Sequence, residues 1–260
     1  MFTQAEYCVA SLEPQTDAVK AARTAYNLAT KTFGPEQHFT KEGATVRTVT
    51  SITLGIALLA FGAWSVTLSA QATAQTHIGH VLDSFNGTPD NMGLLPTAMA
   101  EAKVAADHAA LAAKATSLQM IQTHAGHVIN AIDPTIVAQG PGKGYGLKKA
   151  AQGVAQHAMF AANAANANDM VKTHSMHVST AAQNVVAMSD EVVALAQKIR
   201  MSTSLDEAKM LAAEMQTKAE QLTTGVDADK NGQISWNKPE GGLAQAQQHM
   251  NFMKAAAGTQ

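Results

Sequence analysis

Beyond residue 75, apolar residues recur with helical spacing between short polar breaks. The clearest case is residues 169–201, where two neighbouring stripes run along one face and are formed by His174, Ala181, Met188 and Leu195 and by Val178, Val185 and Val192. Residues 118–132 show the same spacing, and again a histidine lies on the apolar face. This periodicity predicts amphipathic helices whose histidines face inward.

Caps and breakers set the limits of the expected elements. Ser204 and Glu207 form a capping-box pattern. Turns are expected at 86–89, at 133–134, at 140–142 and from 225 onward, and the Gly-rich stretch 140–146 is expected to be a flexible connector. The fold class is therefore all-α, a helical bundle built from repeated helical hairpins, with helices near 76–85, 97–116, 118–132, 145–166, 169–201, 205–223 and 240–256.

The amino-acid composition reduces the number of functions that can be expected. Hydrophobic residues make up 46% of the chain but aromatic residues only 5%, which favours closely packed helices. Lys and Arg total 18 against 20 Asp and Glu, so nucleic acid is not an expected partner. Cys8 is the only cysteine, which excludes covalent c-type haem attachment. No catalytic spacing is recognisable, and we expect a protein that is not an enzyme.

Residues 49–70 form an apolar run, and no Asp, Glu, Lys or Arg occurs between Arg47 and Asp83. The run is followed by Ala-Thr-Ala at 72–74, which predicts a signal peptide cleaved before Gln75. The alternative is an uncleaved anchor in the inner membrane. Either interpretation places the remainder in the periplasm or outside the cell, and membrane contact is expected only through this segment.

Four regions follow from this organisation. The head before the basic flank is unusually long for a signal peptide, which suggests a misassigned start with translation beginning near Val46. The regions are a head at 1–46, a signal peptide or anchor at 47–74, His-rich repeated hairpins at 75–203, and a C-terminal hairpin with an acidic loop at 204–260.

A histidine motif occurs three times. It reads THIGHV at 76–81, THAGHV at 123–128 and THSMHV at 173–178. Residues three apart share a helix face, so each motif presents two imidazoles together. The candidate metal ligands in the motifs are His77, His80, His124, His127, His174 and His177.

Single histidines in Ala-rich segments supply a third ligand. Within each predicted hairpin, His108 would join the first motif and His157 the second. The third motif has no such histidine, and Met170, Met176 or His249 could substitute. Imidazole suits a transition-metal ion, with Cu or Zn favoured over Ni or Fe. The alternative is haem b, held by two histidines from facing helices.

The acidic stretch at 227–235 resembles the first nine positions of an EF-hand calcium loop. The resemblance implies calcium ligands at Asp227, Asp229, Asn231, Gln233 and Ser235. Lys238 stands where the family has a bidentate acid, and Glu240 lies two residues later. The resemblance therefore implies weak calcium binding that includes Glu240, and the alternative is an ordinary Asx turn.

Taken together, the sequence resembles exported, His-rich helical proteins with one EF-hand-like loop. The expected function is binding of transition-metal ions at the repeated His-x-x-His motifs, for storage, buffering or delivery. One alternative is a haem-b electron carrier. Another is a calcium-stabilised interaction module in which the histidines are structural.

Overall fold

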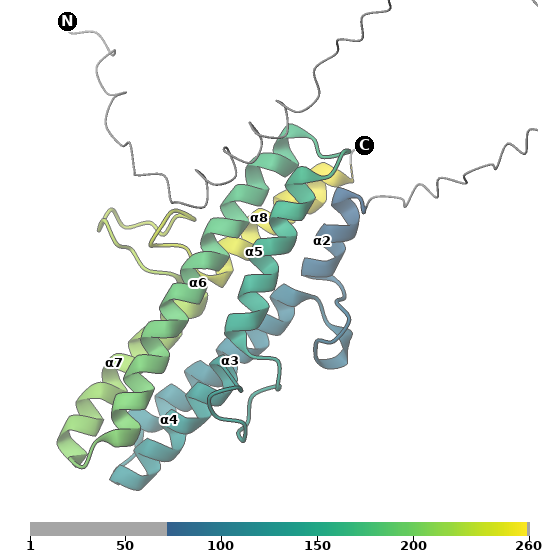
Figure 1. Cartoon of the computed structure of the whole chain (residues 1–260). Coiled ribbons are helices and arrows are strands. Elements are labelled where there is room, and N and C mark those ends of the chain that lie inside the picture. Colours follow the sequence, from purple (N-terminus) through teal and green to yellow (C-terminus); the bar gives the residue numbers. More distant parts are fainter. Residues whose placement is uncertain (1–71, 259–260) are drawn as a thin grey trace, which may run out of the picture. The chain divides into compact units, whose positions relative to one another are not determined.

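A computed structural model describes residues 72–258, and this part of the chain is helical without strands. The predicted head and nearly all of the predicted export segment lie outside the described residues. Within the described range, none of the helices combines the length and apolar character required to cross a membrane. The elements, drawn in Figure 1, are α2 (Ala74–Leu82), η1 (Pro89–Asn91), α3 (Leu94–Lys114), α4 (Leu118–Ile132), α5 (Leu147–Asn163), α6 (Asp169–Met201), α7 (Leu205–Thr224) and α8 (Leu243–Ala257).

Side-chain caps fix the first turns of four helices. Thr73, Ser117, Asn168 and Ser204 each accept a hydrogen bond from the backbone N–H three residues later. The predicted capping box at Ser204 is only half present, because the Glu207 carboxylate accepts a hydrogen bond from the Ser202 hydroxyl at 2.6 Å. The predicted limits of 118–132 and 169–201 are confirmed at both ends.

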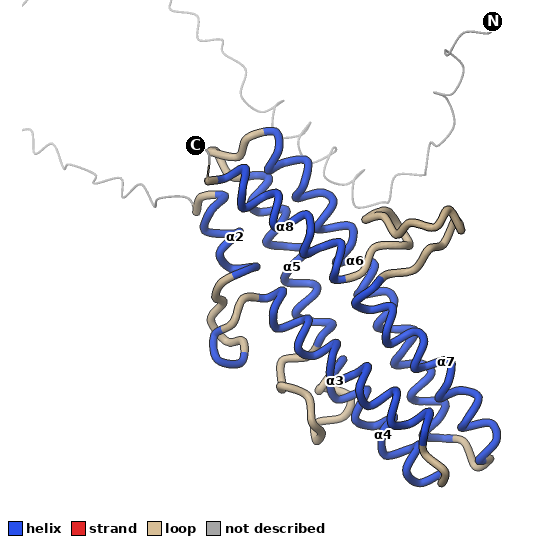
Figure 2. Tube along the Cα trace, turned by 180° about the vertical axis from the view of Figure 1, so that it is seen from behind, coloured by secondary structure: helices blue, strands red, loops and turns tan. Residues whose placement is uncertain are grey.

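Small side chains form much of the core. Alanines on the inner faces of α3 and α5 are fully buried, which lets these helices pack closely against their neighbours. The longest helix, α6, has 33 residues and contacts α4, α5, α7 and α8 (Figure 2). The predicted all-helical bundle is confirmed for the described residues.

The helices that pair differ from the predicted hairpins. We expected α2 with α3 and α4 with α5, but α2 packs mainly on α5 and α4 packs mainly on α3. The turn between α3 and α4 comprises only residues 115–117, and such a short connection forces its two helices to lie antiparallel and adjacent. The longer connections before α3 and after α4 impose no such constraint.

The Gly-rich connection at 140–146 is held in place rather than loose. Glu101 on α3 is fully buried, and its carboxylate accepts hydrogen bonds from the backbone N–H groups of Lys143, Tyr145 and Gly146 at 2.9 to 3.1 Å. Asn130 accepts a further bond from Gly142 at 2.9 Å. The expectation of a flexible connector is therefore wrong, because a buried carboxylate requires donors and this loop supplies them.

The first described helix, α2, begins at the predicted cleavage position. Thr73 caps α2, and Ala74 is buried with its N–H donating to the side chain of Asn166 at 2.9 Å. Asn166 also donates to Gln75 at 2.6 Å. These contacts explain why α5 ends at Asn163 rather than at 166, since Asn166 binds the start of α2 instead of extending its own helix.

Candidate metal centre

All nine histidines of the described residues gather into three groups of three. In each group, one nitrogen of every ring lies within 4.8 Å of the other two, and the groups consist of histidines alone. Each combines the two histidines of one motif with a single histidine from another helix. We call them the N-terminal triad (His77, His80, His157), the middle triad (His108, His124, His127) and the C-terminal triad (His174, His177, His249).

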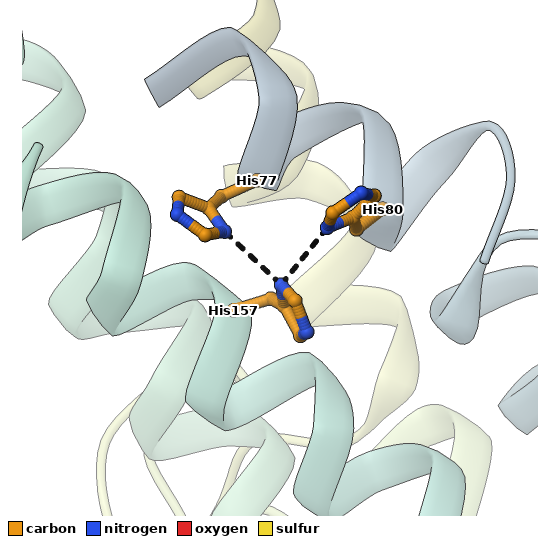
Figure 3. A group of neighbouring side chains, drawn as sticks. All are labelled: His77, His80 and His157. Atoms are coloured by element: carbon orange, nitrogen blue, oxygen red, sulfur yellow. Dashed lines mark hydrogen bonds between the residues drawn. The ribbon is translucent and has the colours of Figure 1, made fainter. Parts of the chain in front are cut away.

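The N-terminal triad joins α2 to α5. The two motif histidines project from one face of α2 toward the ring of His157 on α5 (Figure 3). The Nδ1 atom of His157 lies 3.2 Å from Nδ1 of His77 and 3.3 Å from Nδ1 of His80. The three rings thus direct the same type of nitrogen at one point.

The other two triads repeat this geometry on different helices. In the middle triad, Nδ1 of His108 on α3 lies 3.1 Å and 3.2 Å from the Nδ1 atoms of the motif on α4. In the C-terminal triad, Nδ1 of His249 on α8 lies 2.9 Å and 3.4 Å from those of the motif on α6. Each triad therefore links two helices through Nδ1 atoms.

The histidines lie at the rim of the helix interfaces. Every one of the nine is half-buried, and every one directly precedes a buried residue, as His77 precedes Ile78 and His127 precedes Val128. The inward direction predicted from the apolar stripes is thus only partly right. Because consecutive helical residues differ by about 100° of rotation, a histidine beside a core position falls at the boundary between core and solvent.

Hydrogen bonding cannot satisfy such a group. A neutral imidazole Nδ1 has either one proton or one lone pair, so the central nitrogen cannot form good bonds to two others. A metal ion at the centre would accept a lone pair from all three. Two nitrogens bound tetrahedrally at about 2.0 to 2.1 Å are about 3.3 to 3.4 Å apart. The observed separations of 2.9 to 3.4 Å lie at or a few tenths of an ångström below that value.

Burial favours the neutral form of seven of these histidines. It lowers the pKa of His157 to about 4, and repulsion from His80 and His77 contributes. The pKa of His249 is lowered to about 4 for the same reason, with repulsion from its two partners. Burial also lowers the pKa of His77, His108, His124, His174 and His177. Neutral imidazole is the form that binds metal.

These pKa values predict an acid-sensitive fold for the metal-free protein. Between the ordinary histidine pKa of 6.5 and about 4, the unfolded chain binds protons that His157 and His249 in the folded chain do not. The free energy of unfolding should therefore fall as pH is lowered through this window and be insensitive to these groups above it. Urea titrations at several pH values measure it. The double variant His157→Ala/His249→Ala should show a smaller slope, and an unchanged slope would contradict the prediction.

The eight predicted histidine ligands are all in the triads, but their grouping differs from the prediction. We expected His108 with the first motif and His157 with the second, whereas the structure exchanges them. The cause is the helix pairing described above. His249 completes the third group, as one of the three options allowed, while Met176 is 60% exposed. A sequence signal was available, since Gln-His-x-x-Phe occurs at both 156–160 and 248–252.

The triads do not suit the haem alternative. Axial ligands must lie on opposite faces of a macrocycle, but here the nitrogens face a common point and are separated by at most 3.4 Å from the central one. No flat ring fits between them.

The acidic loop brings together three of its six predicted ligands. Carboxylate oxygens of Asp227, Asp229 and Glu240 lie within 4.8 Å of one another, so Glu240 occupies the place that Lys238 leaves without an acid. The Ser235 hydroxyl donates to Glu240 at 2.6 Å, and this bond lowers the pKa of the Glu240 carboxyl.

Two other predicted ligands, Asn231 and Gln233, form hydrogen bonds within the loop. The Asn231 side chain donates to Asp229 at 2.8 Å and accepts from the N–H of Gln233 at 2.8 Å. These bonds shape the turn and direct the Asn231 amide toward the loop itself.

Comparison with known protein families, curated proteins and solved structures finds no match to this chain. The function must therefore be argued from the site alone.

Proposed function

We propose that this protein binds up to three transition-metal ions, one at each histidine triad, and serves to store, buffer or deliver them rather than to catalyse a reaction. One observation carries the proposal, which is the convergence of three imidazoles in each triad, with Nδ1 separations at or slightly below those of a tetrahedral metal site. We further propose that this role is performed outside the cytoplasm, on the strength of residues 49–74.

The ligand set favours Zn²⁺ or Cu²⁺. Imidazole nitrogen is a borderline donor that both ions accept readily, whereas calcium and magnesium prefer oxygen. Within the described residues, each triad contains neither a thiolate nor a carboxylate. Three neutral ligands leave the charge of the ion uncompensated, so a water or an external anion would occupy the fourth position.

Counting bound metal tests the proposal. The chain, equilibrated with zinc and then desalted, should retain three equivalents by elemental analysis. His157→Ala, His108→Ala and His249→Ala should each retain two, since each removes the central ligand of one triad. Gln156→Ala is the matched control, because Gln156 is exposed beside His157 and belongs to no triad. Three equivalents in all the histidine variants would refute the assignment.

Calcium binding by the acidic loop is a second candidate, favoured by the convergence of Asp227, Asp229 and Glu240. Calcium at about one hundred times its dissociation constant adds about 2.7 kcal/mol, which is a rise in melting temperature of about 5 to 10 °C. Asp229→Ala should abolish the rise, and Glu214→Ala, which removes an exposed carboxylate from α7, should not. No rise at millimolar calcium would leave the loop as an Asx turn.

A further inference from the structure

The three triads differ in what covers them. In the N-terminal triad, the ring of Phe85 lies 5.6 Å from that of His80 and 5.2 Å from that of His157. On the other side, the Phe160 ring lies 5.3 Å from His77 and 5.5 Å from His157. Two aromatic rings therefore pack against the imidazoles of this triad.

The C-terminal triad has the same arrangement with a larger ring. Trp236 stacks on His177, with ring centroids 3.7 Å apart and planes inclined by 15°, and its edge faces His249 at 6.3 Å. Phe252 lies 5.0 Å from His174 and 5.7 Å from His249. This triad is likewise in contact with two aromatic rings.

The middle triad has no such cover. Among the described residues, the only rings in contact with its three imidazoles are the imidazoles themselves. Leu111 stands three residues after the single histidine, where the other triads have Phe160 and Phe252, and the three side chains are similarly exposed, at 45%, 42% and 45%. The difference is thus chemical, since an aliphatic side chain replaces an aromatic ring at this position.

The connections between helices explain the difference. Phe85 lies in the segment that follows α2, and Trp236 lies in the long loop that precedes α8. Each of these loops has enough residues to place a ring over a neighbouring triad. The middle triad lies between α3 and α4, which are joined only by residues 115–117, and so short a turn cannot fold back over its own helices.

Aromatic rings that pack against the ligands affect the rate at which a bound metal ion is released. A bound ion is released when an external donor takes its open coordination position and displaces the histidines one by one. Aromatic rings against the ligands hinder that approach, hold the imidazoles in place and exclude water. An uncovered triad with the same three ligands lacks these restraints.

We propose that the middle triad is the transfer site of this protein, where metal enters and leaves through an external nitrogen, oxygen or sulfur donor at the fourth coordination position. The two covered triads hold their ions for longer. This inference rests on the proposed function and adds to it a division of labour among the three sites.

Three single-triad proteins test the division. Each retains one triad because the central histidines of the other two are replaced by alanine, so that His157→Ala/His249→Ala retains only the middle triad. Each full-length chain is loaded with Co²⁺, whose visible spectrum reports its ligands, and mixed with excess ethylenediaminetetraacetate. The middle triad should lose cobalt at least about tenfold faster than the others, which is the size of effect that groups around metal ligands typically have.

Exchanging aromatic and aliphatic side chains beside the triads should change the rates of cobalt release in opposite directions. Leu111→Phe, at an exposed position that accepts a larger side chain, should slow release from the middle triad. Trp236→Leu/Phe252→Leu should speed release from the C-terminal triad. Equal rates from the three chains, or slowest release from the middle triad, would overturn the inference while the proposed function stands. Failure of all three chains to bind cobalt, with helicity by circular dichroism intact, would instead refute the proposed function.

Discussion

Zinc should raise the melting temperature of this protein by about 15 °C or more when its concentration is about one hundred times the dissociation constant. Each occupied site adds about 2.7 kcal/mol under that condition, so three sites add about 8 kcal/mol. The physical reason is that each triad takes ligands from two helices, and only the folded chain brings them together. Bound ions would therefore link α2 to α5, α3 to α4 and α6 to α8.

Differential scanning calorimetry with and without zinc measures this rise. A chelator should reverse it, and magnesium at the same concentration should not reproduce it, because magnesium prefers oxygen ligands. The triple variant His108→Ala/His157→Ala/His249→Ala is the decisive control, since it removes one ligand from every triad and leaves alanine, a good helix former, in each helix. A full zinc-dependent rise in that variant would mean that stabilisation comes from somewhere other than the triads.

Local signals in the sequence predicted the helices well. The start of α6 is fixed by Asn168 and that of α4 by Ser117, and both are residue types that accept hydrogen bonds from the first turn. The i, i+3 spacing likewise placed each pair of motif histidines on one helix face. These features depend on a few consecutive residues, so the sequence alone could predict them.

The partner of each motif depends on tertiary packing, and there the prediction was wrong. The faces of α3 and α5 that hold the single histidines are built of similar buried alanines, namely Ala105, Ala109 and Ala112 on one and Ala151, Ala155 and Ala158 on the other. Because alanine side chains are small and identical, the two faces have similar shapes, and the sequence does not show which partner helix each face packs against. The short turn at 115–117 was the better guide, because connection length constrains which helices can be neighbours.

The aromatic covers were also beyond sequence reasoning. Phe85 and Trp236 lie in loops, where no periodic pattern predicts the direction of a side chain. They contact His157 and His177 respectively, and each of these histidines is far away along the chain. The place of Glu240 was easier to predict, because it is an acidic residue only two positions after the end of the calcium-type loop. The structure gives it a hydroxyl donor in Ser235 and two neighbouring carboxylates.

The grouping of the histidines can be tested by pairs of substitutions. Because His157 shares a triad with His77, the double variant His157→Ala/His77→Ala should lose one zinc equivalent, no more than His157→Ala alone. His124 belongs to another triad, so His157→Ala/His124→Ala should lose two. The measurement is elemental analysis of the desalted proteins at neutral pH, with helicity followed by circular dichroism.

The opposite pattern would contradict the observed helix pairing as well as the triads. If His157→Ala/His124→Ala lost only one equivalent, those two histidines would share an ion, and α5 would have to pack on α4 rather than on α2. The geometry rules against this, since the Nδ1 atoms of His157 and His77 are 3.2 Å apart and can bind one ion without helix movement. His108 supplies the complementary case, because His108→Ala/His124→Ala should lose one equivalent and His108→Ala/His77→Ala two. The four double variants have equal numbers of substitutions, so any difference in bound zinc reports which histidines share an ion.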